Sequence, residues 1–148
     1  AIGFPHDNEP YYDVHISTGV FHWVPYEEKG IYIQKAYQCL KPGGRLAIWC
    51  SAGKSSEDEA LKAGYCSLSE DGFRDLFQKT GLFNKVSVEQ LVYPYRFKSF
   101  EEFKRWFKAS SHQDLEDHPK FIEKFVTMED DGQVTCTIPR VSIIACKS

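Results

Sequence analysis

The chain has 148 residues, the size of one domain or of a large piece of one. Lys and Arg number 18 against 21 Asp and Glu, and this net charge of −3 argues against a nucleic-acid surface or a polybasic membrane patch. Hydrophobic residues make up 42% of the chain and suffice for a packed core, but no apolar run approaches the roughly 20 residues that cross a bilayer.

The first third of the chain alternates between strand and helix patterns. Residues 13–17 alternate apolar and polar side chains, which predicts a short strand, and the apolar patch 20–24 follows it. Over 26–40 the period becomes that of a helix. The apolar face of this helix carries Ile33, Ala36, Tyr37 and Leu40. Residues 41–44 (Lys-Pro-Gly-Gly) should end the helix, and the apolar run 45–50 predicts a buried strand.

The middle of the chain continues this alternation. Residues 51–67 are polar, with one short helical candidate at 57–63. Ser69 can cap a helix that Gly81 ends, because serine accepts from the first-turn amides and glycine accepts positive φ. The apolar face of that helix carries Phe73, Leu76 and Phe77. Residues 85–93 then predict a strand.

The last third contains two helix signals and one strand signal. Ser99 and Glu102 have the spacing of a capping box, and Pro119 suits the first turn of a further helix. A turn at 130–132 precedes a strand at 137–146. Alternating strands and helices indicate an α/β layer structure with a largely parallel sheet. No repeat or linker divides it, so we expect one domain over 1–148.

Two motifs that suggest a ligand are explained better by loops. Gly53-Lys54-Ser55 follows a buried strand, but a phosphate loop needs glycine five residues earlier, where Ile48 stands. The segment 112–118 has two histidines and acidic residues, but the histidines are six apart between helix signals. A polar connection is the better interpretation, and we expect no metal. The dinucleotide fingerprint G-x-G-x-x-G is absent.

The cysteines and the first residue bear on where the protein works. The five cysteines are scattered without a C-x-x-C pair, which favours reduced thiols and a cytoplasmic protein over a disulfide framework. The chain begins at Ala1, and its only methionine is Met128. We therefore expect a trimmed or partial sequence.

The strongest signal is composite. The strand Asp-Val-His-Ile-Ser at 13–17 is followed by Phe-His-Trp-Val at 21–24, a helix, and Leu-Lys-Pro-Gly-Gly-Arg-Leu at 40–46. This order resembles the later half of the Rossmann-like (class I) S-adenosylmethionine-dependent methyltransferases. The C-terminal segment, with its final strand at 138–145, resembles the subgroup of trans-aconitate and juvenile-hormone-acid methyltransferases, which methylate carboxylates.

The resemblance implies an incomplete version of the family's sheet. It implies strands four to seven with their helices, and a helical insertion at 94–136 that caps the substrate. The glycine-rich loop after the family's first strand and the acidic residue after its second have no counterpart here. We therefore expect methyl transfer to a small molecule, with S-adenosylmethionine as cofactor, from a longer chain, and expect this fragment alone to be inactive.

The resemblance also implies roles for single residues. Ser17, Thr18 and Gly19, just after the strand, would line the sulfonium end of the cofactor. His22 and Trp23 would face the cavity between cofactor and substrate as catalytic residues, although a core tryptophan and a satisfied histidine remain equally open. The substrate would be held by residues of the C-terminal segment. These are Arg96, Arg105, Trp106 and Arg140.

Whether the implied methyl transfer needs a general base depends on the acceptor group. A carboxylate acceptor is already ionised at neutral pH and needs no base, whereas a hydroxyl or an amine would need one, for which His22 is the candidate. Arginine suits an acidic substrate because its planar fork matches a carboxylate, but arginines in solvent on an amphipathic helix are the alternative. A second hypothesis is a non-catalytic binding or dimerisation module, in which a homodimer covers the exposed first strand.

Overall fold

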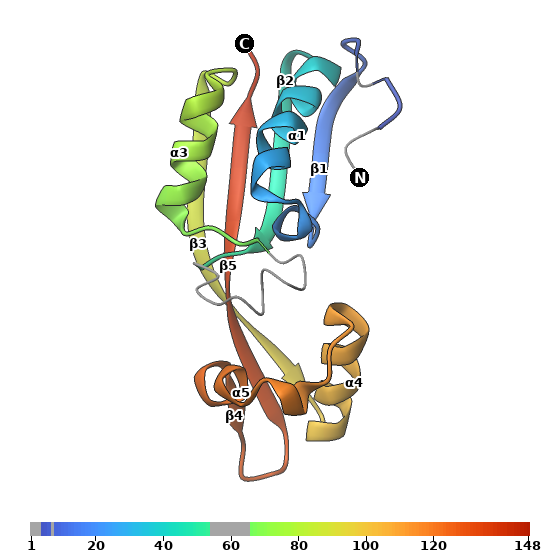
Figure 1. Cartoon of the computed structure of the whole chain (residues 1–148), viewed down its shortest axis with the longest axis vertical. Coiled ribbons are helices and arrows are strands. Elements are labelled where there is room, and N and C mark those ends of the chain that lie inside the picture. Colours follow the sequence, from blue (N-terminus) through green and yellow to red (C-terminus); the bar gives the residue numbers. More distant parts are fainter. Residues whose placement is uncertain (1–3, 7, 54–65) are drawn as a thin grey trace. The chain divides into compact units, whose positions relative to one another are not determined.

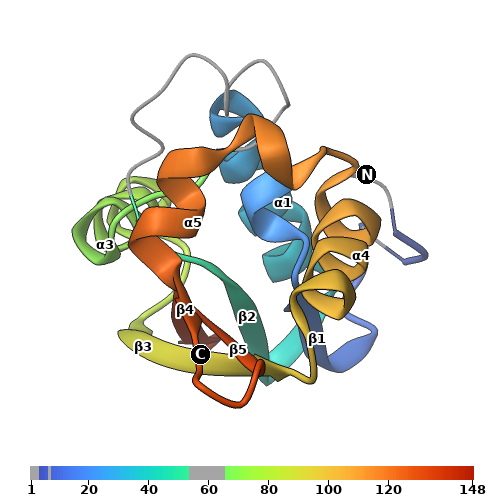
Figure 2. The ribbon, with the colours of Figure 1, turned by 90° about the horizontal axis from the view of Figure 1, so that it is seen from below.

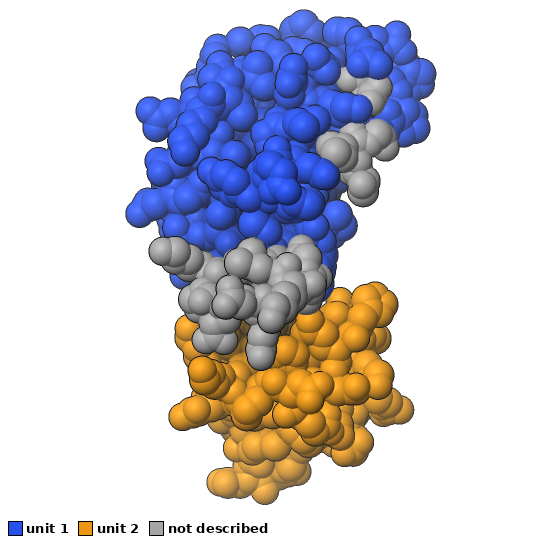
Figure 3. All heavy atoms as spheres, viewed as in Figure 1, with its two compact units in different colours: residues 1–91, 139–148 blue, residues 92–138 orange. Residues whose placement is uncertain are grey.

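A computed structural model describes residues 4–6, 8–53 and 66–148 of the chain (Figure 1). The chain divides into two units, residues 1–91 with 139–148, and residues 92–138 (Figure 3). The second unit includes the segment 94–136, which we predicted as an insertion. The helix predicted at 57–63 lies outside the described residues.

The first unit is built on a mixed sheet. Strands β1 (Tyr12–Thr18) and β2 (Leu40–Ser51) pair in parallel, and β5 (Val134–Cys146) pairs antiparallel to β2. The order along the sheet is β1-β2-β5-β3, with β3 spanning Lys85–Phe97. The α/β class is therefore confirmed, but the prediction of a largely parallel sheet is wrong for the last strand. Periodicity reports burial along a strand and does not report which strand lies beside it.

The Lys-Pro-Gly-Gly segment starts β2 as a bulge. Leu40 pairs with Tyr12 and Arg45 with Val14, so residues 41–44 lie opposite a single residue of β1. Gly43 has φ of +79°, and a Cβ on Gly44 would lie 2.8 Å from the Lys41 carbonyl oxygen. Both glycines are thus required by the backbone. The strand begins five residues before the predicted start at 45, because the bulge continues the pairing across this segment.

Two helices cover one face of this sheet (Figures 1 and 2). They are α1 (Tyr26–Cys39) and α3 (Glu70–Thr80), and both confirm the predicted helices. The Ser69 hydroxyl accepts from the Gly72 amide at 3.1 Å, and Gly81 ends α3 with φ of +62°. The apolar faces of both helices pack on the sheet. Their fully buried members include Ile33, Ala36 and Phe73.

The opposite face of the sheet is open among the described residues. Ile16, Ala47 and Ile144 are paired across β1, β2 and β5 and therefore point to the same side. Ile16 is 67% exposed, Ile144 39%, and Val14 of the same face 50%. Strand β1 is also the edge of the described sheet. An apolar face and an unpaired edge thus coincide.

The second unit has its own core. Helix α4 (Phe100–Ser111), η2 (Leu115–Asp117) and α5 (Pro119–Phe125) precede a hairpin of β4 (Val126–Met128) and β5. Ser99 caps α4 by accepting from the Glu102 amide, while the Glu102 carboxylate accepts from the Lys98 amide. The capping box is therefore confirmed, with its return bond one residue earlier than usual. The buried core comprises Phe103, Phe107, Leu115, Val134 and Cys136.

Candidate active site

The carboxyl ends of β1 and β2 meet at one edge of the sheet, because the two strands are parallel. Ser17 and Thr18 end β1, Gly19 follows, and the Gly19 amide donates to the Trp49 carbonyl of β2 at 2.7 Å. Ser51 ends β2. This is the edge at which open α/β sheets bind ligands.

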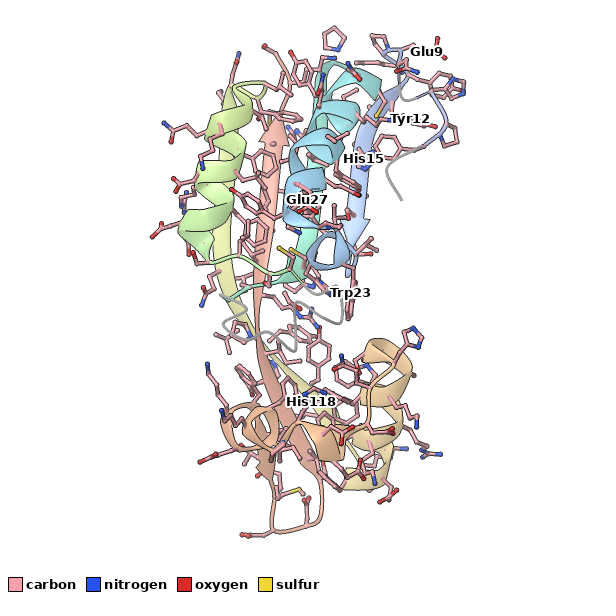
Figure 4. The ribbon with its side chains drawn as sticks, viewed as in Figure 1. Glu9, Tyr12, His15, Trp23, Glu27 and His118 are labelled. Carbon is pink, nitrogen blue, oxygen red and sulfur yellow. The ribbon has the colours of Figure 1, made fainter. Side chains whose placement is uncertain are left out.

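A one-turn helix, η1 (Phe21–Trp23), follows the end of β1 and carries the two residues predicted as catalytic. His22 is 5% exposed, and Trp23 is half-buried with its ring 5.3 Å from the His22 ring. In Figure 4, Trp23 lies beyond the carboxyl end of β1. The His22 carbonyl accepts from the Cys66 amide at 2.6 Å, so this turn is tied to the segment before α3.

Ser51 forms hydrogen bonds with three other residues of the site. Its amide donates to His22 Nδ1 at 3.3 Å, and its carbonyl accepts from the Ser67 hydroxyl at 2.6 Å. Its own hydroxyl accepts from Arg140 Nη1 at 2.7 Å, consistent with the pairing of Ser51 and Arg140 across β2 and β5. The structure therefore brings together His22, Trp23 and Arg140, which the sequence placed in two different roles.

These surroundings set the charge state of His22. Burial, and then the positive charges of Arg140 and Lys29, lower the pKa of His22 to about 4. The imidazole is thus neutral at neutral pH. Because Nδ1 accepts a hydrogen bond from a backbone amide, this bond assigns the remaining ring proton to Nε2.

The residues predicted to contact a cofactor differ in orientation. Thr18 and Gly19 are exposed, and no atom of the described residues lies within 4 Å of a Cβ built on Gly19. Ser17 is 5% exposed and shares the sheet face of His15, whose Nε2 lies 2.9 Å from the Tyr32 hydroxyl of α1. The Ser17 oxygen is buried without a hydrogen bond of normal geometry, although the Tyr32 phenol is close enough to interact with it. Exposed Thr18 and Gly19, and not buried Ser17, are therefore accessible to a polar ligand at this strand end.

Three polar residues of this region were missed from the sequence. Ser51 and Ser67 are 5% and 3% exposed, and Lys29 is fully buried. Position is the signal that could have found them: Ser51 ends the apolar run of a strand, and Lys29 precedes Ile33 by four residues, on the apolar face of its helix.

The other predicted substrate residues belong to the second unit. Arg96 on β3 and Arg105 on α4 are exposed. Trp106 is half-buried, 5.5 Å from the Tyr95 ring and 5.2 Å from the Phe97 ring. Their roles toward a substrate stay predictions.

Of the two motifs that suggested a ligand in the sequence, Lys54 and Ser55 of Gly53-Lys54-Ser55 lie outside the described residues, whereas the segment 112–118 is described. No group of three or more His, Cys, Asp or Glu residues that could hold a metal occurs in the described part of the chain. In the segment 112–118, His112 is exposed and ends α4, and the ring of His118 packs 5.8 Å from the Phe107 ring. No helix of the described residues is long and apolar enough to cross a membrane.

Comparison with known protein families and with curated proteins finds no match for this sequence. Solved structures, in contrast, match its fold. A Bacillus halodurans protein proposed to be a methyltransferase is 15% identical, with a TM-score of 0.59 over 95% of this chain and 66% of its own. The [4+2]-cyclase SpnF is 13% identical, with a TM-score of 0.56 over 99% of this chain and 53% of its own.

A third match was solved with ligands. Phosphoethanolamine N-methyltransferase 2 of Haemonchus contortus, in complex with phosphomonomethylethanolamine and S-adenosylhomocysteine, is 15% identical, with a TM-score of 0.53. The match covers 95% of this chain and 34% of that protein. The chain thus spans from one third to two thirds of the length of these proteins. At such low identity the likeness shows the fold alone, and that fold is the Rossmann-like methyltransferase sheet.

Proposed function

We propose that this chain is part of an S-adenosylmethionine-dependent methyltransferase that acts on a small molecule. The observation that carries the proposal is the network of His22, Ser51 and Arg140 at the carboxyl ends of β1 and β2. Solved proteins with this fold support it, because they include a methyltransferase in complex with S-adenosylhomocysteine. Fold alone would not suffice, since one fold supports many activities.

The proposed acceptor is a carboxylate. Its oxygen would accept the methyl group that bound S-adenosylmethionine supplies, and because a carboxylate is ionised at neutral pH, no residue of this chain would have to remove a proton. An amine or a hydroxyl would need a base, and His22 is a weak one because its pKa is about 4 and its Nδ1 already accepts from Ser51. The Arg140 guanidinium beside it supplies the charge that a carboxylate pairs with.

The cofactor would be held at the end of β1. Thr18 and Gly19 border the open space there, and bound S-adenosylmethionine would supply an electrophilic methyl group on a positively charged sulfur. The role of the chain is to align acceptor and methyl group and to exclude water. Because the sequence lacks the family's glycine-rich loop, we propose that other parts of a longer protein make further contacts with the cofactor. We therefore expect the 148-residue chain alone to be inactive.

The test is a methylation assay of the longer protein with radiolabelled S-adenosylmethionine and matched acceptors that differ only in carrying a carboxylate, an alcohol or an amine. The expected product is a methyl ester, from which alkali releases the label as methanol, whereas ethers and methylamines keep it. Alkali-stable label would overturn the choice of a carboxylate. Failure of S-adenosylmethionine to bind at all would overturn the proposed activity.

The variant Arg140→Met tests the proposed anchor. Its expected effect is a rise in KM for the acidic acceptor by roughly tenfold or more, the scale of one lost charge-assisted hydrogen bond. Arg96→Met, Arg105→Met and Trp106→Ala test the predicted substrate residues of the second unit in the same assay. Arg45→Met is the matched control, because Arg45 is exposed near the start of β2, at the end of the strand away from Ser51.

The open sheet face favours a second candidate, a non-catalytic module that dimerises. Exposed Val14 and Ile16 lie on β1, the edge of the described sheet. If the chain is such a module, it should form a stable homodimer without affinity for S-adenosylmethionine, and Ile16→Lys should dissociate that dimer. Analytical ultracentrifugation and a calorimetric titration with S-adenosylmethionine on the same sample separate the two candidates.

A further inference from the structure

Lys29 is a cation in the interior of the first unit. It stands in the first turn of α1 and is 0% exposed. Its ammonium donates to the carbonyl of Phe21 at 2.5 Å and to that of Val24 at 2.7 Å. It also lies 4.6 Å from the centre of the Phe21 ring, over its face.

This position is costly for a charge. Removing an ammonium from water costs several kcal/mol, and the positive end of the α1 dipole lies at the same turn. No carboxylate pairs with Lys29 among the described ion pairs. A methionine would fill a similar volume without this cost, so the ammonium must do something that an apolar side chain cannot.

The two carbonyls that accept from Lys29 indicate the role of its ammonium group. Phe21 begins the η1 turn and Val24 immediately follows it, so the bonded carbonyls bracket His22 and Trp23. The N-cap residue of this turn, Val20, makes no side-chain capping bond to the described residues. On its other side, the turn is fixed by the bond from the Ser51 amide to His22 Nδ1. The turn is thus fastened to α1 by Lys29 and to β2 by Ser51.

We propose that Lys29 is a positioning residue, which holds the η1 turn so that His22 and Trp23 stay beside Ser51 and Arg140. The inference rests on the proposed function, because it assigns Lys29 to the same site. Because its side chain is fully buried, we assign Lys29 no direct contact with a substrate.

The pKa values of His22 and Lys29 are consistent with the position of Lys29 beside the η1 turn. The charge of Lys29 contributes to the lowered pKa of His22, after burial and Arg140. The pKa of Lys29 is in turn lowered by burial, while the nearby thiols of Cys66 and Cys50 act in the opposite direction. The titratable and charged groups around the turn therefore come from α1, β2, β5 and the segment before α3. Loss of the ammonium should raise the pKa of His22.

The experiment is an NMR titration of the His22 ring and the Trp23 indole in Lys29→Met, with Lys79→Met as the matched control on the exposed end of α3. Urea unfolding first establishes that each variant folds. We expect Lys29→Met to shift the Trp23 resonance and to raise the His22 pKa above about 4, although burial and Arg140 still lower it, with no change in Lys79→Met. A folded Lys29→Met with wild-type signals from both residues would overturn the proposal.

A second measurement decides the matter if Lys29→Met does not fold. In Cys66→Ser, which removes the half-buried thiol nearby, alkaline pH is used to deprotonate Lys29. The His22 and Trp23 resonances should then shift together with the Lys29 signal, and unchanged resonances would refute the proposal. Neither measurement uses S-adenosylmethionine. A failure of the proposed function would appear as missing cofactor binding, with these signals intact.

Discussion

The neutral state of His22 makes the free energy of unfolding depend on pH. In the unfolded chain His22 takes up a proton near its ordinary pKa of about 6.5, whereas in the folded chain it does so only near 4. Between these values the unfolded state binds more protons, so acid favours unfolding. Above pH 6.5 both states are neutral at this residue, and His22 has no effect.

The size of the effect follows from the two pKa values. A difference of this size corresponds to about 3 kcal/mol below pH 4, and to about 2 kcal/mol at pH 5. The variant His22→Asn isolates it, because the amide oxygen can accept from the Ser51 amide at the position of Nδ1 and does not titrate.

The assay is urea unfolding of both chains from pH 7.5 to 4.5. The wild type should lose about 2 kcal/mol more than His22→Asn between pH 7 and pH 5. Burial also lowers the pKa of His15, but that residue is common to both chains and cancels in the difference. Parallel pH curves for the two chains would refute the assignment of a neutral buried imidazole.

Three further predictions concern the backbone and the core, and urea midpoints check each of them. Gly44→Ala should cost about 1–3 kcal/mol, because its Cβ would lie 2.8 Å from the Lys41 carbonyl oxygen, and a cost of a few tenths or less would show that the bulge can shift. Ser69→Ala should cost about 1 kcal/mol through loss of the α3 cap, with exposed Ser87→Ala as its control. Phe73→Ala, at a fully buried ring, should cost about 3–5 kcal/mol, and a smaller loss would mean that the core around α3 collapses into the space.

Local structure was predictable where local rules decide it. Helix α3 lies between the Ser69 cap and Gly81, and helix α1 follows its apolar period. Strand β4 was missed, because its three residues are too few to show a period. Strand β5 begins at Val134, before the predicted start at 137, because it also pairs with β4 there, and β3 continues to Phe97 beyond the predicted end at 93. The antiparallel neighbour of β2 comes from about 90 residues away, which no local pattern reports.

The site was predictable only in part, because its contacts join residues that are far apart in the sequence. The resemblance singled out His22 and Trp23, and the structure shows why His22 is held: Ser51, which follows it by 29 residues, donates to its ring. Sequence reasoning offered His22 as a general base. That role depends on the pKa, which burial lowers first and Arg140 and Lys29 lower further, and on which ring nitrogen is engaged, which the Ser51 amide determines. Only the tertiary structure brings these groups together.

The low pKa of His22 narrows the range of reactions compatible with the site more than the fold does. The same sheet occurs in an N-methyltransferase and in a [4+2]-cyclase, so the fold is compatible with either reaction type. A weakly basic His22 disfavours reactions that must remove a proton from the acceptor, but methylation of a carboxylate and a cyclisation both proceed without one. Product mass separates these two, because methyl transfer makes the acceptor heavier and consumes S-adenosylmethionine, whereas a cyclisation leaves its mass unchanged. An acceptor converted without a mass change would therefore reject methyl transfer even if S-adenosylmethionine were bound.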